Sequence, residues 1–192
     1  MEVEPFAVGL TDPLRTADGE LDRREGFLVR LERDGTRGVG EATPLTGWTE
    51  SMATCRAALD AVAAGDRDPT DLDPAETPAA RHAVELARID LAARQHGVPL
   101  AEWLEADATD SIPVNATIGD TDPAGTAAAA RDAVKAGFDC LKVKVGARSL
   151  TADLDRLRAL RDAVGSVELR ADANGAWSPA VAEQAVDDSP TF

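Results

Sequence analysis

From about residue 108 onward, strand-like segments alternate with helix-like segments, and this alternation limits the folds open to the chain. The strand-like segments are 111–119, 139–146 and 167–175. Alternation of this kind predicts parallel strands joined by helical crossovers. The pitch is regular, because Asn115, Lys144 and Asp172 lie 29 and 28 residues apart, each toward the end of its segment. An open doubly wound sheet and a (β/α)8 barrel both allow this pitch.

The side-chain pattern of the strands favours one of these two folds. In the second segment the leucine and valines share one face, while Lys142 and Lys144 lie on the other. In the third segment Asp172 and Asn174 share the polar face. Strands covered by helices on both sides would be apolar on both faces. One polar face therefore predicts a barrel, with an active site at the carboxyl ends of its strands.

The first hundred residues follow a different pattern, with a strand meander and then two helices. The predicted strands are 3–10, 24–35 (ending at the turn signal Asp34-Gly35) and 36–44. The polar segment 11–23 is predicted to be a loop long enough to form a lid. Thr49 is predicted to cap a helix that ends at Gly65, and 79–97 forms the second helix. We therefore predict an α+β domain over residues 1–107 and a partial barrel of about three βα units over 108–192.

The charge of the chain excludes some partners. Its 35 acidic and 20 basic residues give a net charge of −15, which repels nucleic acid and anionic membranes. No apolar run approaches the roughly 18 residues that span a bilayer. Because the N-terminus also lacks a signal-peptide pattern, we expect a cytoplasmic location. The acid-rich, lysine-poor composition suggests a salt-adapted protein, since salt screens self-repulsion.

The lysines are scarce, and their placement points to chemistry. The chain has 17 arginines but only three lysines, of which Lys142 and Lys144 share one strand face. Mutual repulsion and partial burial favour the neutral amine, the form that acts as a base. The alternative is that both lysines extend to solvent from an edge strand. Asp172, one strand over, is a candidate ligand for a hard cation, or else a salt-bridge partner of the lysines. Together these residues predict proton abstraction next to a carboxylate, with the enolate held by Mg²⁺.

Several motifs resemble one known family. "KVKVG", followed by the aspartate of "RADANGAW", resembles the enolase superfamily in its muconate-lactonising subgroup. The meander with "GVGEATPLTGW" resembles the N-terminal capping domain of that superfamily, and "IPVNATIG" resembles its first barrel strand. Within the subgroup, "GEATPLTGWTES" and "PVNATIG" look most like the o-succinylbenzoate synthases of menaquinone biosynthesis. The resemblance thus implies a Mg²⁺-assisted lyase acting on a small-molecule carboxylate. Dipeptide epimerases share the same framework and are the alternative.

The resemblance also implies roles for individual residues. Lys144 matches the proton-abstracting base, and Lys142 matches the neighbour that tunes this base and helps hold the enolate. Asp172 matches the first of three carboxylate metal ligands. Asn174 lies on the same face, where it is expected to hydrogen-bond near the metal or bind substrate.

Two further substrate contacts are expected from the first domain. They are Arg15, in the predicted lid around residues 14–19, and Trp48, in the Gly47-Trp48 turn. For these residues a solvated arginine and a core tryptophan are alternatives at least as well supported.

The sequence departs from the family in one respect. A family barrel has eight strands, whereas this sequence ends in "VAEQAVDDSPTF" after the third. The two remaining metal carboxylates and the opposite-face lysine are thus absent from it, so we expect either a truncated fragment of such an enzyme or a barrel piece that a different strand completes. Two other readings stay open: a Schiff-base barrel that uses a lysine nucleophile, and a non-catalytic fragment that binds a partner through its open edge.

Overall fold

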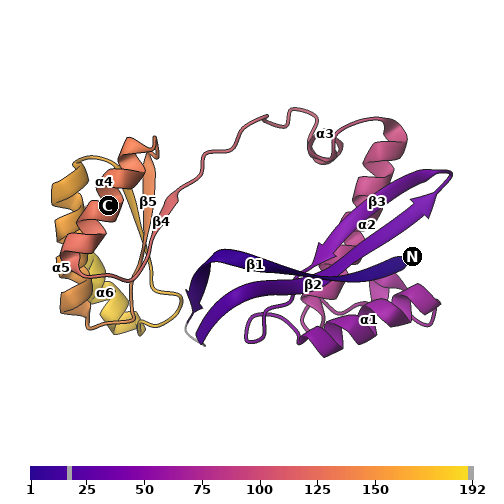
Figure 1. Ribbon diagram of the computed structural model, residues 1–192, viewed down its shortest axis with the longest axis horizontal. Helices are drawn as coiled ribbons and strands as arrows, with labels where there is room; N and C mark the ends of the chain where they lie inside the picture. The colour runs from indigo at the N-terminus through magenta and orange to yellow at the C-terminus, as the bar shows by residue number, and fades with distance from the viewer. Residues whose placement is uncertain (17–18, 190–192) are drawn as a thin grey trace. The chain divides into compact units, whose positions relative to one another are not determined.

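The computed structural model describes residues 1–16 and 19–189, and the side chains of residue 12 and residues 14–20 fall outside this description. The chain divides into two compact units, Met1–Asp110 and Ser111–Phe192. Each unit contains its own three-stranded sheet (Figure 1). The predicted division into two domains, with a boundary after residue 107, stays a prediction.

The sheet of the first unit is an antiparallel meander in the order β1-β2-β3. Its strands are β1 (Glu2–Thr16), β2 (Gly19–Arg33) and β3 (Thr36–Ala42). The turn predicted at Asp34-Gly35 is confirmed, since both residues have positive φ, 52° and 75°. Such a turn matches the right-handed twist of the strands that it joins.

The predicted lid loop over 11–23 is wrong for the described backbone. After a register irregularity between Gly9 and Leu14, pairing resumes with Leu14 opposite Leu21 and continues to Thr16 opposite Gly19. Pro13 does not interrupt the strand, because β1 lies at the edge of the sheet and a proline is tolerated there. Residues 17 and 18 of the predicted lid lie outside the described residues.

The two predicted helices of the first unit, α1 (Met52–Ala64) and α2 (Pro78–His96), begin and end close to the predicted residues. The described part of the unit has two further short helical segments that were not predicted, a 3₁₀ turn η1 (Pro69–Asp71) and α3 (Leu100–Leu104). The cap of α1 is Ser51 rather than Thr49, since Ser51 Oγ accepts the Thr54 N–H at 3.1 Å. Thr49 Oγ1 instead accepts the Leu45 N–H at 2.7 Å. No helix in the described part of the chain is long and apolar enough to cross a membrane.

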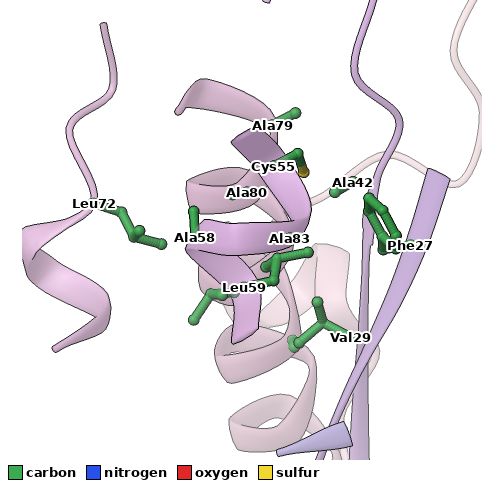
Figure 2. Close-up of a cluster of buried hydrophobic side chains, with 12 residues drawn as sticks. Phe27, Val29, Ala42, Cys55, Ala58, Leu59, Leu72, Ala79, Ala80 and Ala83 are labelled. Atoms are coloured by element: carbon green, nitrogen blue, oxygen red, sulfur yellow. The ribbon is translucent and has the colours of Figure 1, made fainter. Parts of the chain in front are cut away.

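Helices α1 and α2 pack on one face of the β1-β2-β3 sheet. Figure 2 shows Phe27 and Val29 of β2 pointing toward the small side chains of both helices. The helix α2 lies directly on β3, because a Cβ at Gly40 would fall 1.9 Å from the Ala83 carbonyl oxygen. Ala83 is fully buried. The glycine is thus required for close approach of helix and strand.

The second unit alternates strands and helices, as predicted. Its elements are β4 (Ala116–Ile118), α4 (Pro123–Lys135), β5 (Cys140–Lys144), α5 (Leu150–Val164), β6 (Glu168–Asp172) and α6 (Pro179–Asp188). The strands are parallel, with β5 in the centre. Leu141 and Val143 of β5 are completely buried, whereas Lys142 and Lys144 are partly exposed. The predicted division of this strand into an apolar and a polar face is confirmed.

Only the apolar face of the parallel sheet is covered by α4 and α5 (Figure 1). Leu157 and Leu160 of α5 and Ala130 of α4 pack against β5 from this side. A doubly wound sheet would carry helices on both faces. The chain is therefore an α+β domain followed by the first part of a (β/α)8-type barrel, as the sequence predicts.

The first barrel strand is shorter than predicted. Pairing with β5 extends only from Ala116 to Ile118, so Asn115 precedes β4 instead of ending it. Strict alternation would place Val114 and Ala171 on the covered face, but both are exposed. Val114 lies outside the pairing with β5, and Ala171 lies on β6, which is an edge strand.

Candidate active site

The side chains of Lys142, Lys144 and Asp172 meet at the carboxyl ends of β5 and β6. Lys144 pairs with Asp172 in the strand register, and Lys142 lies two residues earlier on the same face. Both ammonium nitrogens lie 2.7 Å from Asp172 Oδ2. The structure thus brings together the three residues that the sequence predicts for catalysis and metal binding.

Asn174 joins this group through its amide oxygen and its backbone. Lys144 Nζ donates to Asn174 Oδ1 at 2.7 Å, and Asn174 N–H donates to Asp172 Oδ1 at 2.9 Å. Asn174 has φ of 47°, a left-handed conformation that asparagine tolerates better than most residues. This backbone turn places the Asn174 amide oxygen in contact with Lys144, while its expected role toward metal or substrate stays a prediction.

The contacts of Asp172 fix its charge. The ammonium groups of Lys142 and Lys144 donate to the carboxylate and hold the pKa of Asp172 well below its usual range. The salt bridge that the sequence left open as an alternative is therefore present. Two ammonium groups against one carboxylate leave a local positive charge, in a chain of net charge −15. Such a patch favours a negatively charged ligand.

The described residues fit a magnesium ion only in part. Within residues 1–16 and 19–189, no group of three or more His, Cys, Asp or Glu side chains is placed to hold a metal. Asp172 supplies one carboxylate, and its Oδ2 is already shared by Lys142 and Lys144. Because Mg²⁺ takes near-octahedral oxygen ligation, this set alone does not make a magnesium site.

Two buried charged residues beside the site escaped the sequence reading. Arg156 and Asp153 of α5 form an ion pair at 3.0 Å, with side chains 1% and 0% exposed. The signal was available, because Asp153, Arg156, Leu157 and Leu160 have the i, i+3, i+4, i+7 spacing of one helix face. Charged residues at such positions indicate a buried polar network.

Two substrate contacts, Trp48 and Arg15, were expected from the first unit. Trp48 is 66% exposed in the turn after β3, where the Trp48 backbone N–H donates to the Leu45 carbonyl oxygen at 2.9 Å. The alternative of a core tryptophan is therefore wrong. The Arg15 side chain lies outside the described part of the structure. Both substrate roles stay predictions.

Comparison with known proteins shows what the chain resembles. Residues 125–189 match the family model described as Enolase C-terminal domain-like. The L-Ala-D/L-Glu epimerase of Bacillus subtilis is 34% identical, over 97% of this chain and 55% of that enzyme. The hydrophobic dipeptide epimerase of Enterococcus faecalis is 30% identical, over 97% of this chain and 56% of that enzyme. A crystal structure of the dipeptide epimerase from E. faecalis, complexed with Mg and the dipeptide L-Leu-L-Tyr, superposes with a TM-score of 0.85 at 29% identity, covering 97% of this chain and 56% of that one.

These matches correct the finer prediction. The relatives are epimerases, so they favour the alternative reading, a dipeptide epimerase, over the expected o-succinylbenzoate synthase-like lyase. They give no support to the expected role in menaquinone biosynthesis or to salt adaptation. The chain spans about half the length of the curated relatives that it matches. In its motifs, its fold and these matches, the chain is thus similar to enzymes of the enolase superfamily, and the family model itself matches residues 125–189.

Proposed function

We propose that the whole protein containing this chain is a dipeptide epimerase, which inverts the α-carbon next to the free carboxylate of a dipeptide. The observation that carries the proposal is the convergence of Lys142 and Lys144 on Asp172 at the ends of β5 and β6. The names of the B. subtilis and E. faecalis relatives support the substrate class. The local positive charge of the site suits a substrate that carries a carboxylate.

Lys144 takes the part of the acid–base group. Its amine removes the α-proton, the C–H electron pair moves toward the adjacent carboxylate as an enolate, and the amine becomes an ammonium group. In the described geometry Lys144 donates to Asp172 and Asn174, which is the arrangement of the proton donor. To act as a base, Lys144 must first give up a proton and one of these contacts.

Lys142 and the other candidates have supporting roles. The Lys142 ammonium group, on the same strand face, would stabilise the charge that develops on the enolate. Both lysines project from one face of one strand, so they serve one side of the α-carbon, and inversion also takes an acid on the opposite side. Asp172 stays the proposed ligand for a divalent cation, supported by the Mg in the E. faecalis relative. Trp48 and Arg15 stay proposed contacts to the dipeptide.

The proposal is tested by α-proton exchange in D₂O, followed by proton NMR on the whole protein. We expect deuterium incorporation and epimerisation with L-Ala-L-Glu or with a hydrophobic dipeptide such as L-Leu-L-Tyr. Dehydration of a cyclohexadiene carboxylate to o-succinylbenzoate, without exchange in any dipeptide, would overturn the proposal in favour of the lyase. Covalent trapping of a carbonyl substrate by borohydride would overturn it in favour of a Schiff-base enzyme.

The chain supplies its own matched control for the role of Lys144. For the epimer whose α-proton Lys144 removes, Lys144→Ala should lower exchange by at least ~10²-fold, since general base catalysis typically contributes 10²–10⁴-fold. Lys142→Ala should lower the rate of α-proton exchange by a smaller factor than Lys144→Ala does. Lys135, the third lysine, lies exposed at the end of α4, so Lys135→Ala should leave exchange unchanged. Near-normal exchange in Lys144→Ala would show that another group is the base.

A further inference from the structure

The ion pair between Arg156 and Asp153 lies inside the second unit and contacts the ends of β4 and β5. A buried charge is costly unless it is paired and its remaining hydrogen-bonding groups are satisfied. Here every guanidinium nitrogen has a partner. Arg156 Nη1 donates to Asp153 Oδ1 at 3.0 Å and to the Lys144 carbonyl oxygen at 2.9 Å. Nη2 donates to the Gly119 carbonyl oxygen at 2.8 Å, and Nε donates to Thr126 Oγ1 at 3.2 Å.

Asp153 uses its second oxygen on the same segment. Asp153 Oδ2 accepts the Gly146 N–H at 2.7 Å. The ion pair therefore holds both ends of the turn 144–146, with Arg156 on the Lys144 carbonyl group and Asp153 on the Gly146 amide. The residue between them is held from β6, because the Val145 N–H donates to the Asp172 carbonyl oxygen at 3.1 Å.

We propose that Arg156 and Asp153 are positioning residues for Lys144, which fix the backbone from which the acid–base side chain extends. The inference rests on the proposed function, because Lys144 matters as the proton-transfer group. Neither residue touches the reacting atoms. Arg156 acts through the Lys144 carbonyl group, and Asp153 acts through the turn that follows.

The strand ladder explains why Lys144 depends on this pair and Lys142 does not. Lys142 is paired on both sides, with Thr117 of β4 and Arg170 of β6. The ladder between β4 and β5 ends at Ile118 and Val143, so Lys144 is paired only with β6. At this level Arg156 replaces the missing pairing by bridging the Gly119 and Lys144 carbonyl groups. A flexible lysine stem transfers any movement of its backbone to the reactive nitrogen, and proton transfer is sensitive to such displacement.

The catalytic test uses Arg156→Lys in the whole protein, with each epimer of a dipeptide assayed separately for α-proton exchange. Lysine keeps the charge, but its single ammonium group cannot replace the planar fork that reaches several partners. We expect kcat to fall about 10- to 100-fold for the epimer whose exchange Lys144→Ala abolishes, with little change in KM. Exchange of the other epimer should be largely retained, because its proton is removed from the opposite side.

A matched control lies on the same helix. Arg158 also pairs with an aspartate three residues before it, Asp155, but both side chains are about half exposed. Arg158→Lys should leave both epimers and the melting temperature unchanged. Asp153→Asn, a second variant of the buried pair, should show the same epimer asymmetry as Arg156→Lys. An equal loss for both epimers, in step with lowered thermal stability, would overturn the inference in favour of a merely structural role.

A second measurement separates this inference from the proposed function. On the 192-residue chain, amide hydrogen exchange of Gly146 is followed by ¹⁵N NMR. Exchange should be about tenfold faster or more in Arg156→Lys and Asp153→Asn than in Arg158→Lys, as the loss of a hydrogen bond to a charged group implies. Unchanged Gly146 exchange overturns the positioning role, whatever the activity. Faster Gly146 exchange together with no turnover of any dipeptide by the wild-type protein supports the clamp on the turn and overturns the proposed function alone.

Discussion

Replacement of Glu50 should destabilise the first unit through a helix cap that reaches across the chain. Glu50 is 8% exposed, and its two oxygens accept the N–H groups of Ala79 at 3.1 Å and Ala80 at 2.8 Å. These are orphan donors of the first turn of α2, whose own N-cap residue, Thr77, makes no side-chain cap bond. Glu50 therefore satisfies the start of a helix that begins at Pro78.

The magnitude follows from the two bonds. A hydrogen bond to a charged group contributes about 1.5–3 kcal/mol, and both amides stay buried when Glu50 is removed. Glu50→Ala should thus lower the free energy of unfolding by ~3 kcal/mol or more. For a unit of this size that loss lowers the melting temperature by roughly 12 °C or more. Glu50→Gln keeps one good acceptor, the amide oxygen, so it should lower the free energy of unfolding by about half as much.

The assay is thermal and urea unfolding followed by far-UV circular dichroism, with amide exchange of Ala79 and Ala80 as the local readout. Glu85→Ala is the control. Glu85 lies on α2, the helix that Glu50 caps, but its side chain is exposed and forms a salt bridge with Arg81 at 2.8 Å. An exposed pair of this kind contributes about 0.5 kcal/mol. The proposed helix cap would be refuted if Glu50→Ala unfolded at the same temperature and urea concentration as Glu85→Ala while the amides of Ala79 and Ala80 stayed protected from exchange.

Three further predictions concern metal binding, thiol reactivity and pH. The 192-residue chain should bind Mg²⁺ only weakly in calorimetry, because Asp172 is one carboxylate shared with two lysines, and saturable micromolar binding would contradict this. Cys55 should react with iodoacetamide far more slowly than Cys140 in the folded chain, because burial and then the neighbouring Glu50 carboxylate raise the pKa of Cys55 to about 12; equal alkylation rates measured by mass spectrometry would contradict this. The pKa of Asp172 is lowered in the folded state, so its contribution to stability is present above the ordinary carboxyl pKa of 3.8 and is lost as the pH falls below it. Wild type should therefore exceed Asp172→Asn in stability at pH 6 and lose this advantage toward pH 2 in acid titrations of unfolding, and a difference independent of pH would contradict the ion pairs.

Side-chain periodicity made the centre of the site predictable. In a strand, alternate residues share a face, so Lys142 and Lys144 had to point the same way. The crossover pitch of 28 residues then placed Asp172 beside Lys144 in the neighbouring parallel strand. These predictions needed only the alternation of side chains along a strand and the spacing of one strand–helix–strand unit. The structure confirms that the three side chains lie together.

Features that depend on distant partners were not predictable in the same way. The segment 11–23 carries proline, glycine and aspartate turn signals, yet cross-strand pairing extends through most of it. Pairing overrides such local preferences here because proline lacks a backbone N–H, and in an edge strand that N–H can face away from the neighbouring strand. The role of Glu50 was likewise not predictable, because nothing in the local sequence shows that the N–H groups of Ala79 and Ala80 donate to its carboxylate.

The motifs that suggested a substrate could not identify it, because their residues serve the fold. "GEATP" forms the end of β3 and the loop after it, and "PVNATIG" leads into β4. Gly40 in the first motif serves the close approach of α2. Asn115 in the second precedes β4 and lies away from Lys144. Such residues build a frame that several activities share, so they do not distinguish a dipeptide from a cyclohexadiene carboxylate.

The burial of Arg156 and Asp153 affects how the site responds to dissolved ions. Counterions screen charges that face water, with a Debye length of about 10 Å at 0.1 M salt. They have little access to a pair whose side chains are 1% and 0% exposed, whereas the side chains of Lys144 and Asp172 are 38% and 23% exposed. With a net charge of −15, the chain repels itself electrostatically, and added salt screens this repulsion. The backbone at Lys144 thus keeps its place from low to high ionic strength, while the contact at the tip of the same side chain weakens as salt is added.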